Sequence, residues 1–268
     1  MWFNFFRNPH FKSIAAEGTA PEVTGCEGCH GPAKEHVEAR GGKTTIPRAF
    51  SLMPPKAALD TCLSCHAKDF TRANINRSQH TLNDVACTSC HSIHKSATPK
   101  FLLAKVQRDL CYGCHPSVRA QFSMPFKHRV NEGFMQCSDC HNPHGTPPAT
   151  WSMNQRPRMV EHTSTNEESC IKCHSDKRGP FVYEHAPVRV EGCETCHIPH
   201  GSMNNKLLKR PVVFTVCLEC HNQGGTGLTA SGVPLQSSRH NLLDPKYQQC
   251  TSCHMKIHGS NGDPYFKR

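Results

Sequence analysis

The chain has 268 residues and a formal charge of +10, and it is poor in apolar material: 36% of its residues are hydrophobic and the mean hydropathy is −0.57. So few apolar side chains would not offset the ordering entropy of a fold this long, which excludes an ordinary hydrophobic core. No apolar run approaches the ~20 residues that span a bilayer, so no transmembrane helix is expected.

Cysteine and histidine are the two unusual residue types, with 18 and 20 copies. Every cysteine belongs to a CxxC motif, and a histidine follows every CxxC directly. About 0.1 CxxCH motif is expected by chance at this composition, so the pattern is not accidental. The nine motifs are CEGCH (26–30), CLSCH (62–66), CTSCH (87–91), CYGCH (111–115), CSDCH (137–141), CIKCH (170–174), CETCH (193–197), CLECH (217–221) and CTSCH (250–254).

The CxxCH pattern is typical of covalent heme attachment, because two thiols at this spacing match the vinyl groups of the macrocycle and the next histidine reaches the iron. The sequence therefore predicts nine hemes c. The predicted attachment residues are Cys26, Cys29, Cys62, Cys65, Cys87, Cys90, Cys111, Cys114, Cys137, Cys140, Cys170, Cys173, Cys193, Cys196, Cys217, Cys220, Cys250 and Cys253. The predicted proximal iron ligands are His30, His66, His91, His115, His141, His174, His197, His221 and His254.

Three other interpretations of the cysteines fit less well. Zinc ribbons pair two CxxC motifs around each metal and do not need a histidine after each one. Thioredoxin-like chemistry uses a single CxxC on a βαβ scaffold. A disulfide framework does not explain the histidines.

The remaining histidines recur at regular places. In four repeats, 62–94, 111–144, 170–200 and 217–258, a mid-repeat histidine lies between two motifs and a trailing histidine follows the second. Three residues span at most ~10 Å, so a trailing histidine cannot pass around the heme of its own motif and must ligate a neighbouring iron. The distal candidates are His10, His36, His80, His94, His128, His144, His185, His200, His240 and His258. His162 fits neither place, and we interpret it as a surface histidine or as a replacement for one of these ligands.

The first repeat, about 1–40, is incomplete, because the motif expected before His10 is absent. Heme attachment is a periplasmic reaction, so export is expected, yet the first residues resemble no signal peptide. The hypotheses are a truncated or misassigned start, with ten hemes in the complete parent, or a variant that has lost its first heme.

The expected fold is a multiheme cytochrome c, mostly coil with short α-helices wrapped around a heme chain and negligible β-structure. It is expected to form a single elongated domain, 1–268. Short helices are predicted to lead into the motifs within 98–115 and 204–221. Nine hemes with ionised propionates would bring the charge of +10 to about +1 (ferric) or −8 (ferrous), so a nucleic-acid partner is not expected.

Several segments resemble a known family, the decaheme periplasmic cytochromes of outer-membrane porin-cytochrome conduits (the MtrA/DmsE type). They are GCEGCHGPAKEH, CHSIH, CSDCHNPHG, KRGPFVYEHAPVRVEGCETCHIPHG and NNKLLKRP. The resemblance implies a wire of bis-histidine hemes inside a β-barrel porin, exchanging electrons with periplasmic and extracellular redox proteins. Because the first motif is absent, the resemblance leaves His10 without an assigned iron.

The sequence thus favours electron transfer without catalysis, since two histidines per iron leave no free coordination position for a substrate. The alternatives are a soluble periplasmic electron shuttle, a filament-forming cytochrome, and a multiheme reductase of the nitrite or hydroxylamine kind. The CxxCK motif typical of such reductases is absent.

Overall fold

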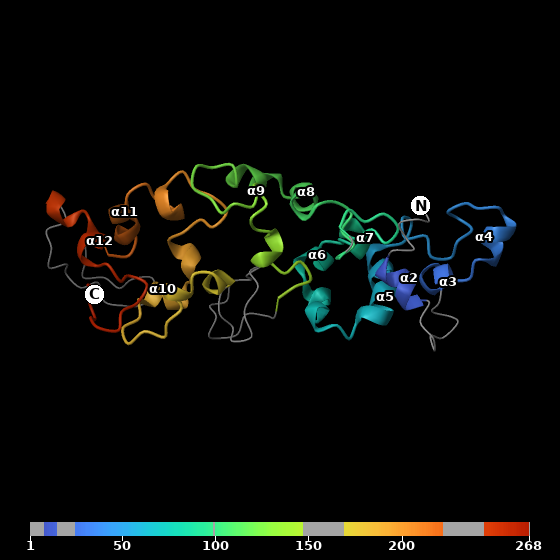
Figure 1. Ribbon diagram of the computed structural model, residues 1–268, viewed down its shortest axis with the longest axis horizontal. Coiled ribbons are helices and arrows are strands. Elements are labelled where there is room, and N and C mark those ends of the chain that lie inside the picture. Colours follow the sequence, from blue (N-terminus) through green and yellow to red (C-terminus); the bar gives the residue numbers. More distant parts are fainter. Residues whose placement is uncertain (1–7, 15–24, 99, 147–168, 222–243, 268) are drawn as a thin grey trace. The chain divides into compact units, whose positions relative to one another are not determined.

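The computed structural model describes residues 8–14, 25–98, 100–146, 169–221 and 244–267 (Figure 1). This part of the chain consists of short helices joined by loops and contains no strand, as the sequence predicts. The α-helices are α2 (Pro9–Ile14), α3 (Gly25–His30), α4 (Lys34–Glu38), α5 (Pro55–His66), α6 (Gln79–Leu82), α7 (Cys87–Cys90), α8 (Gln107–Tyr112), α9 (Pro116–Gln121), α10 (Ala186–Val190), α11 (Val213–Leu218) and α12 (Cys250–Cys253). The 3₁₀ turns are η2 (Phe70–Arg72), η3 (Ile75–Arg77), η4 (Cys137–Asp139), η6 (Ser169–Lys172), η7 (Ser175–Lys177), η8 (Cys193–Thr195), η9 (Asn205–Leu207) and η10 (Pro245–Tyr247).

Helix α5 shows how local sequence produces these elements. Pro55 occupies the first turn, where its missing N–H is not needed and its fixed φ favours the helix. Lys56 and Asp60 form an i,i+4 ion pair at 3.0 Å on the exposed side. Ala58 and Leu59 are buried, so the helix packs on one face and ends with the CLSCH motif.

The two predicted lead-in helices are present. Helix α8 runs directly into the CYGCH motif, and α11 runs directly into CLECH. Helix α11 begins only after Pro211, which is consistent with the proline ending the segment before it. No helix in the described residues is long and apolar enough to cross a membrane.

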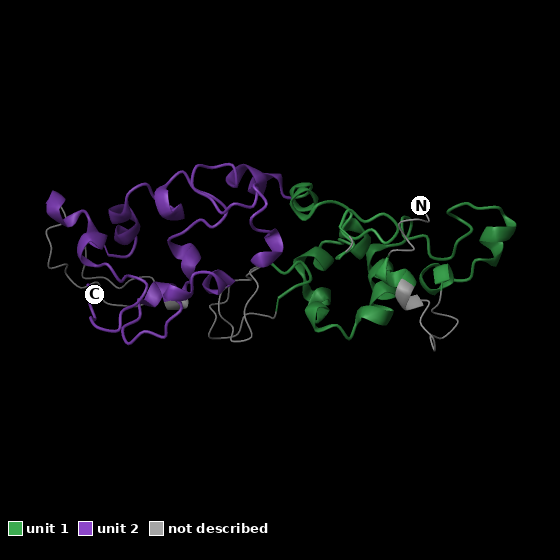
Figure 2. Ribbon diagram, in the orientation of Figure 1, with its two compact units in different colours: residues 1–114, 141–147 green, residues 115–140, 148–268 purple. Residues whose placement is uncertain are grey.

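The chain divides into two compact units, which Figure 2 shows in different colours. Unit 1 comprises Met1–Cys114 and His141–Pro147, and unit 2 comprises His115–Cys140 and Pro148–Arg268. The repeat 111–144 therefore contributes to both units.

The core made by side chains is very small. Among the described residues, the buried hydrophobic side chains are Ala58, Leu59, Ile75, Leu102, Phe122 and Val130. At ~1.5–3 kcal/mol per large buried side chain, six residues fall far short of the ordering cost of such a chain. Groups other than side chains must therefore supply most of the stability.

A chain produced without heme attachment is expected to be largely unfolded, because the hemes would form most of the core. Circular dichroism and small-angle scattering would check this, with the matured red protein as the control. A heme-free chain that scatters as a compact particle would contradict the expectation.

Candidate heme-binding sites

The CxxCH motifs are built on single helical turns. Helices α7 and α12, for example, each consist of the four residues CTSC. Positions i and i+3 share one face of a helix, so both thiols of a motif point the same way. After α7 the chain leaves the helix at the motif histidine, since His91 has φ −105° and ψ 138°. In α3 and α5 the motif histidine is the last residue of the helix. All 18 cysteines are exposed or partly exposed. Each motif therefore offers two accessible thiols beside an imidazole.

Histidines from distant parts of the sequence face each other. In the described residues six such pairs of rings occur, each joining a motif histidine to one of the predicted distal ligands. Their ring centres lie 5.8 to 6.3 Å apart. The pairs are His66 with His10 (5.8 Å), His30 with His94 (5.8 Å), His91 with His144 (6.1 Å), His174 with His128 (6.3 Å), His221 with His185 (6.2 Å) and His197 with His258 (6.3 Å).

This separation fits an iron atom between the two rings. An imidazole nitrogen binds a transition metal at ~2.0 Å and lies about 1.2 Å from its ring centre, so two imidazoles on opposite sides of one metal would have centres about 6.4 Å apart. Face-to-face stacking of two flat rings would bring the centres closer than this. The six pairs therefore leave the gap that a six-coordinate heme iron requires.

The pairs differ in the angle between their rings. Four are nearly parallel, at 13° to 20°, whereas His10 with His66 is at 69° and His128 with His174 is at 65°. Parallel rings would interact with the same iron d orbital, while crossed rings would interact with two different ones. The two classes should therefore give hemes with different electron paramagnetic resonance (EPR) signals.

Hydrogen bonds hold the histidine rings in the orientation that ligation needs. A carbonyl oxygen can only accept, so Nδ1 carries the proton and Nε2 keeps a lone pair for a metal. These Nδ1 contacts are His30 to Arg48 (2.9 Å), His36 to Gly42 (3.0 Å), His80 to Pro143 (3.1 Å), His91 to Phe101 (2.8 Å), His128 to Pro199 (2.6 Å), His197 to Lys206 (2.8 Å) and His254 to Tyr265 (2.5 Å).

Burial favours the neutral imidazole in several pairs. It lowers the pKa of His144 to about 4, with the neighbouring His91 acting in the same direction. Burial is also the main cause of the lowered pKa of His10, His66, His94, His185 and His258. Neutral rings at physiological pH are ready to bind a metal without first losing a proton.

The junctions between repeats share one construction. A mid-repeat histidine ring donates to the carbonyl just before the trailing histidine of a later repeat. His80 bonds to Pro143, His128 bonds to Pro199, and His185 bonds to the carbonyl of Ile257. A glycine follows the trailing histidine at each of these three junctions, at positions 145, 201 and 259.

A second construction holds the last motif of a repeat. A loop downstream of the motif turns back, and its carbonyl accepts from the motif histidine. The next residue has a left-handed backbone, with φ 52° at Leu102, 58° at Leu207 and 60° at Phe266. The carbonyls of these residues accept from the main chain just after the histidine, at Ser92, Ile198 and Lys256. We call these segments, 101–103, 206–208 and 265–267, the clamp loops. Sequence reasoning missed them, although FLLAK and KLLKR each place a leucine pair at a similar distance from the motif, beginning 11 residues after His91 and 10 residues after His197.

Consecutive motifs approach each other through their cysteines. A hydrogen bond between the side chains of Cys62 and Cys87, together with burial, raises the pKa of Cys62. Burial and the neighbouring Cys250 raise the pKa of Cys217 to about 12. Thiols this close belong to motifs that follow one another in the chain, so groups attached to them would be neighbours too.

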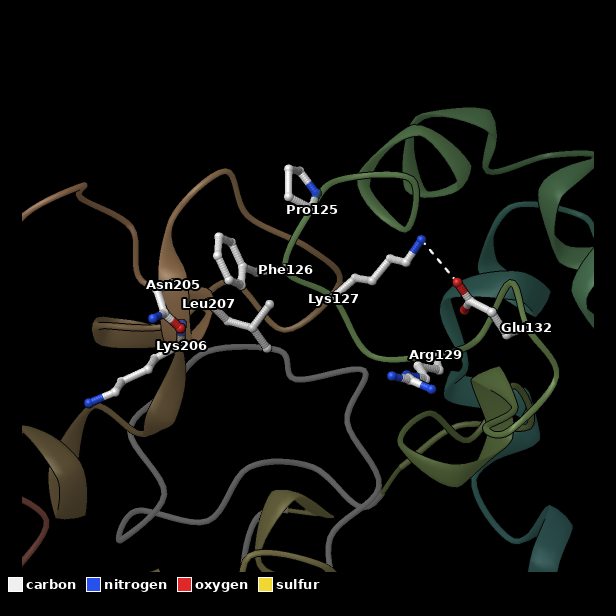
Figure 3. Close-up of a pocket in the computed structure, with 8 residues that line it drawn as sticks. All are labelled: Pro125, Phe126, Lys127, Arg129, Glu132, Asn205, Lys206 and Leu207. Carbon is white, nitrogen blue, oxygen red and sulfur yellow. Dashed lines mark hydrogen bonds and ion pairs between the residues drawn. The ribbon is translucent and has the colours of Figure 1, made fainter.

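A hollow of about 520 Å³ lies between two segments of unit 2 (Figure 3). Residues 125–132, which carry His128, form one side, and residues 205–207, which overlap the clamp loop 206–208, form the other. Its lining includes Lys127, Arg129 and Lys206, and Lys127 pairs with Glu132 at 3.0 Å. Basic side chains here could compensate the propionates of hemes bound by the adjacent histidines.

Other candidates lie elsewhere in the structure. The ring of His200 contacts Phe122 at 5.2 Å, and its Nδ1 lies 2.9 Å from Oε1 of Gln121. His115 is the residue just before α9 and makes no side-chain capping hydrogen bond there, and His141 comes two residues after η4. His162 and His240 lie outside the described residues. His10, which the sequence left without an iron, faces His66.

Three family descriptions match parts of the chain. "Doubled CXXCH motif" matches residues 80–120 and 185–226, "Cytochrome c7 and related cytochrome c" matches 120–198, and "Cytochrome c554 and c-prime" matches 33–92. The multiheme cytochrome MtrA of Shewanella baltica (strain OS185) is 35% identical over 238 residues, which are 88% of this chain and 68% of the relative. The chain belongs to the MtrA-type multiheme cytochromes.

Membership confirms the multiheme cytochrome fold and heme c as the cofactor predicted from the motifs. The MtrA-type cytochromes are electron-transfer proteins and not enzymes, so the chain transfers electrons by c-type hemes. The reductase alternative is thereby set aside.

Gly201, which follows His200, is expected to tolerate no side chain. An added Cβ would lie 2.0 Å from the main-chain oxygen of Gln121. We expect Gly201→Ala to lower the unfolding free energy of the matured protein by about 1–3 kcal/mol, as overpacking does. Chemical denaturation followed by heme absorbance measures the change.

Gly262→Ala is the matched control, because nothing lies within 4 Å of a Cβ added there. Equal stability of the two variants would contradict the close approach at Gly201.

Proposed function

We propose that the chain is a nine-heme wire in which every iron is held by two histidines. In each site the two motif cysteines attach the heme, the motif histidine ligates from one side, and a distal histidine from another part of the chain ligates from the other. The observation that carries this proposal is the set of six facing histidine pairs, each with one motif and one non-motif member and each spaced for an iron.

The pairs also suggest a rule for ligation. A mid-repeat histidine serves the first motif of the next repeat, as with His185 and His221. A trailing histidine serves the second motif of the preceding repeat, as with His258 and His197. Neighbouring repeats would thus exchange ligands in both directions, which keeps successive irons close together.

Heme c supplies an iron that cycles between the ferric and ferrous states. The residues of the chain would hold this iron between two imidazoles, and in the described residues at least seven of the candidate histidines have Nδ1 within hydrogen-bond distance of a main-chain carbonyl. Such ligation favours one-electron exchange over substrate binding and gives lower potentials than histidine-methionine ligation.

We further propose that the protein is exported, lies inside an outer-membrane β-barrel porin, and carries electrons between periplasmic and extracellular redox proteins. The resemblance of its motif series to the porin-cytochrome conduits supports this location. A wire of five paired-heme repeats, the first incomplete, would suit a partner that excludes water and lipid along its length.

Replacing His144 by Met tests the ligand assignment. We expect the variant to keep all its hemes, because His144 attaches none, and to raise the potential of the heme ligated by His91, since methionine donates less to iron. Redox titration with intact mass determination measures both effects.

His162→Gln is the control, since we assign His162 no iron. A titration of His144→Met that overlays the wild-type curve would rule out the ligand role of His144.

A vesicle experiment tests the conduit. The cytochrome is isolated from outer membranes and reconstituted, with any barrel protein that accompanies it, into vesicles that contain a reduced viologen dye. External ferricyanide is expected to oxidise the enclosed dye rapidly. The same complex carrying Cys137→Ser and Cys140→Ser, which removes one heme, is expected to oxidise it at least tenfold more slowly.

Isolation of the cytochrome without a barrel protein, as a monomer or as fibres, would replace the conduit with a shuttle or a filament. Equal rates for the two complexes would show that the dye leaks and that the hemes are not the path.

A further inference from the structure

The junction between the first two repeats departs from the other junctions at one residue. Elsewhere, His80, His128 and His185 each bond to the carbonyl that precedes a trailing histidine. At the first junction the corresponding groups are the ring of His10 and the carbonyl of Ile93, which precedes His94. Here a side chain joins the two.

That side chain is Asn8. Its Oδ1 lies 3.2 Å from Nδ1 of His10 and also accepts from the main-chain N–H of His10 at 2.9 Å. Its Nδ2 donates to the carbonyl oxygen of Ile93. Asn8 is only 4% exposed, although it has a polar amide, so its contacts with the protein take the place of water.

We propose that Asn8 is a positioning residue that relays the hydrogen bond from His10 to Ile93 and thereby sets the reduction potential of the heme at Cys62 and Cys65 apart from its equivalents at the other junctions. The inference rests on the proposed ligation of that heme by His66 and His10, and not on the porin partner.

The physical reason is that a group accepting a hydrogen bond from the ring of a metal ligand changes how strongly that ring donates to the metal. A stronger acceptor at Nδ1 makes the imidazole a better donor, which stabilises ferric iron and lowers the potential. The amide of Asn8 accepts from the ring while it donates to Ile93, and hydrogen bonds in such a chain polarise one another. A main-chain carbonyl cannot be changed by substitution, whereas the side chain of Asn8 can.

The same tripeptide elsewhere supplies a matched control. Asn8, Pro9 and His10 repeat as Asn142, Pro143 and His144. Oδ1 of Asn142 accepts from the main-chain N–H of His144 at 3.0 Å, as Asn8 does for His10. Asn142→Leu therefore removes the equivalent turn at a different heme.

The ring angle provides a signature for the heme in question. His10 and His66 are crossed at 69°, whereas His91 and His144 are nearly parallel at 19°. Crossed ligand planes leave two iron d orbitals close in energy, which gives a low-spin ferric EPR signal of large anisotropy. Each signal disappears when its heme is reduced. The reduction potential of the hemes with crossed ligand planes can therefore be measured separately from that of the hemes with parallel ligand planes.

The experiment is an EPR-monitored redox titration of the full-length, matured cytochrome with Asn8→Leu, Asn8→Asp and Asn142→Leu. Asn8→Leu removes the acceptor without adding charge. We expect it to raise the reduction potential of one heme with crossed ligand planes. At a fixed applied potential the ferric-to-ferrous ratio of that heme should change about tenfold, which corresponds to a shift of ~59 mV for one electron. Asn8→Asp, a stronger acceptor, should lower that reduction potential, and Asn142→Leu should leave the hemes with crossed ligand planes unchanged.

Intact mass establishes that each variant carries the same number of hemes as the wild type. If Asn8→Leu does not mature, Asn8→Asp carries the test alone. The proposal is overturned if the hemes with crossed ligand planes in matured Asn8 variants titrate as in the wild type, or if Asn142→Leu shifts them equally. Because these measurements use the isolated cytochrome, failure of the conduit in vesicles would leave their outcome unaffected.

Discussion

The whole structure depends on one distance, the gap of about 6 Å between the facing imidazoles of two histidines. That gap is too wide for face-to-face stacking of the two rings, and it suits a metal ion between them. The partners come from different repeats, so the ligation of iron would bring together segments that are far apart in the sequence. His91 and His144, for example, are separated by 53 positions. In an ordinary domain, buried apolar side chains make such long-range connections.

This constraint explains why the polypeptide needs so little regular structure. Its helices serve mainly to place two thiols on one face, and four residues are enough for α7. The loops are held by hydrogen bonds to the ligand histidines, as Phe101 holds His91 and Lys206 holds His197. A left-handed residue in each clamp loop costs on the order of 1–3 kcal/mol. In our proposal the same loop orients an iron ligand, and the stability gained by ligation would offset the strain.

The sequence predicts the attachment residues, the proximal ligands and the coil-rich fold because two cysteines and a histidine must be adjacent in the chain to hold one heme. It also predicts His94 and His144 as ligands, since a short tether cannot reach around a macrocycle. It does not predict that His10 faces His66, because that depends on three-dimensional contacts between repeats. Asn8 and the clamp residue Leu207 were missed for the same reason, because a repeated leucine pair or Asn-Pro-His tripeptide does not by itself reveal which distant group it contacts.

Reciprocal ligation has a consequence for how the hemes can be tuned. If each repeat supplies ligands to its neighbours, no heme is bound by one repeat alone. Replacing an iron ligand would then disturb both the folding of the repeats around the heme and the reduction potential of that heme. Hydrogen bonds behind the ligands offer a gentler adjustment, because they alter donor strength while the iron keeps both imidazoles. Main-chain acceptors such as Pro143 and Pro199 give similar environments at successive junctions. With a side-chain acceptor such as Asn8, a single substitution can change the reduction potential of one heme while the histidine pairs between repeats stay the same.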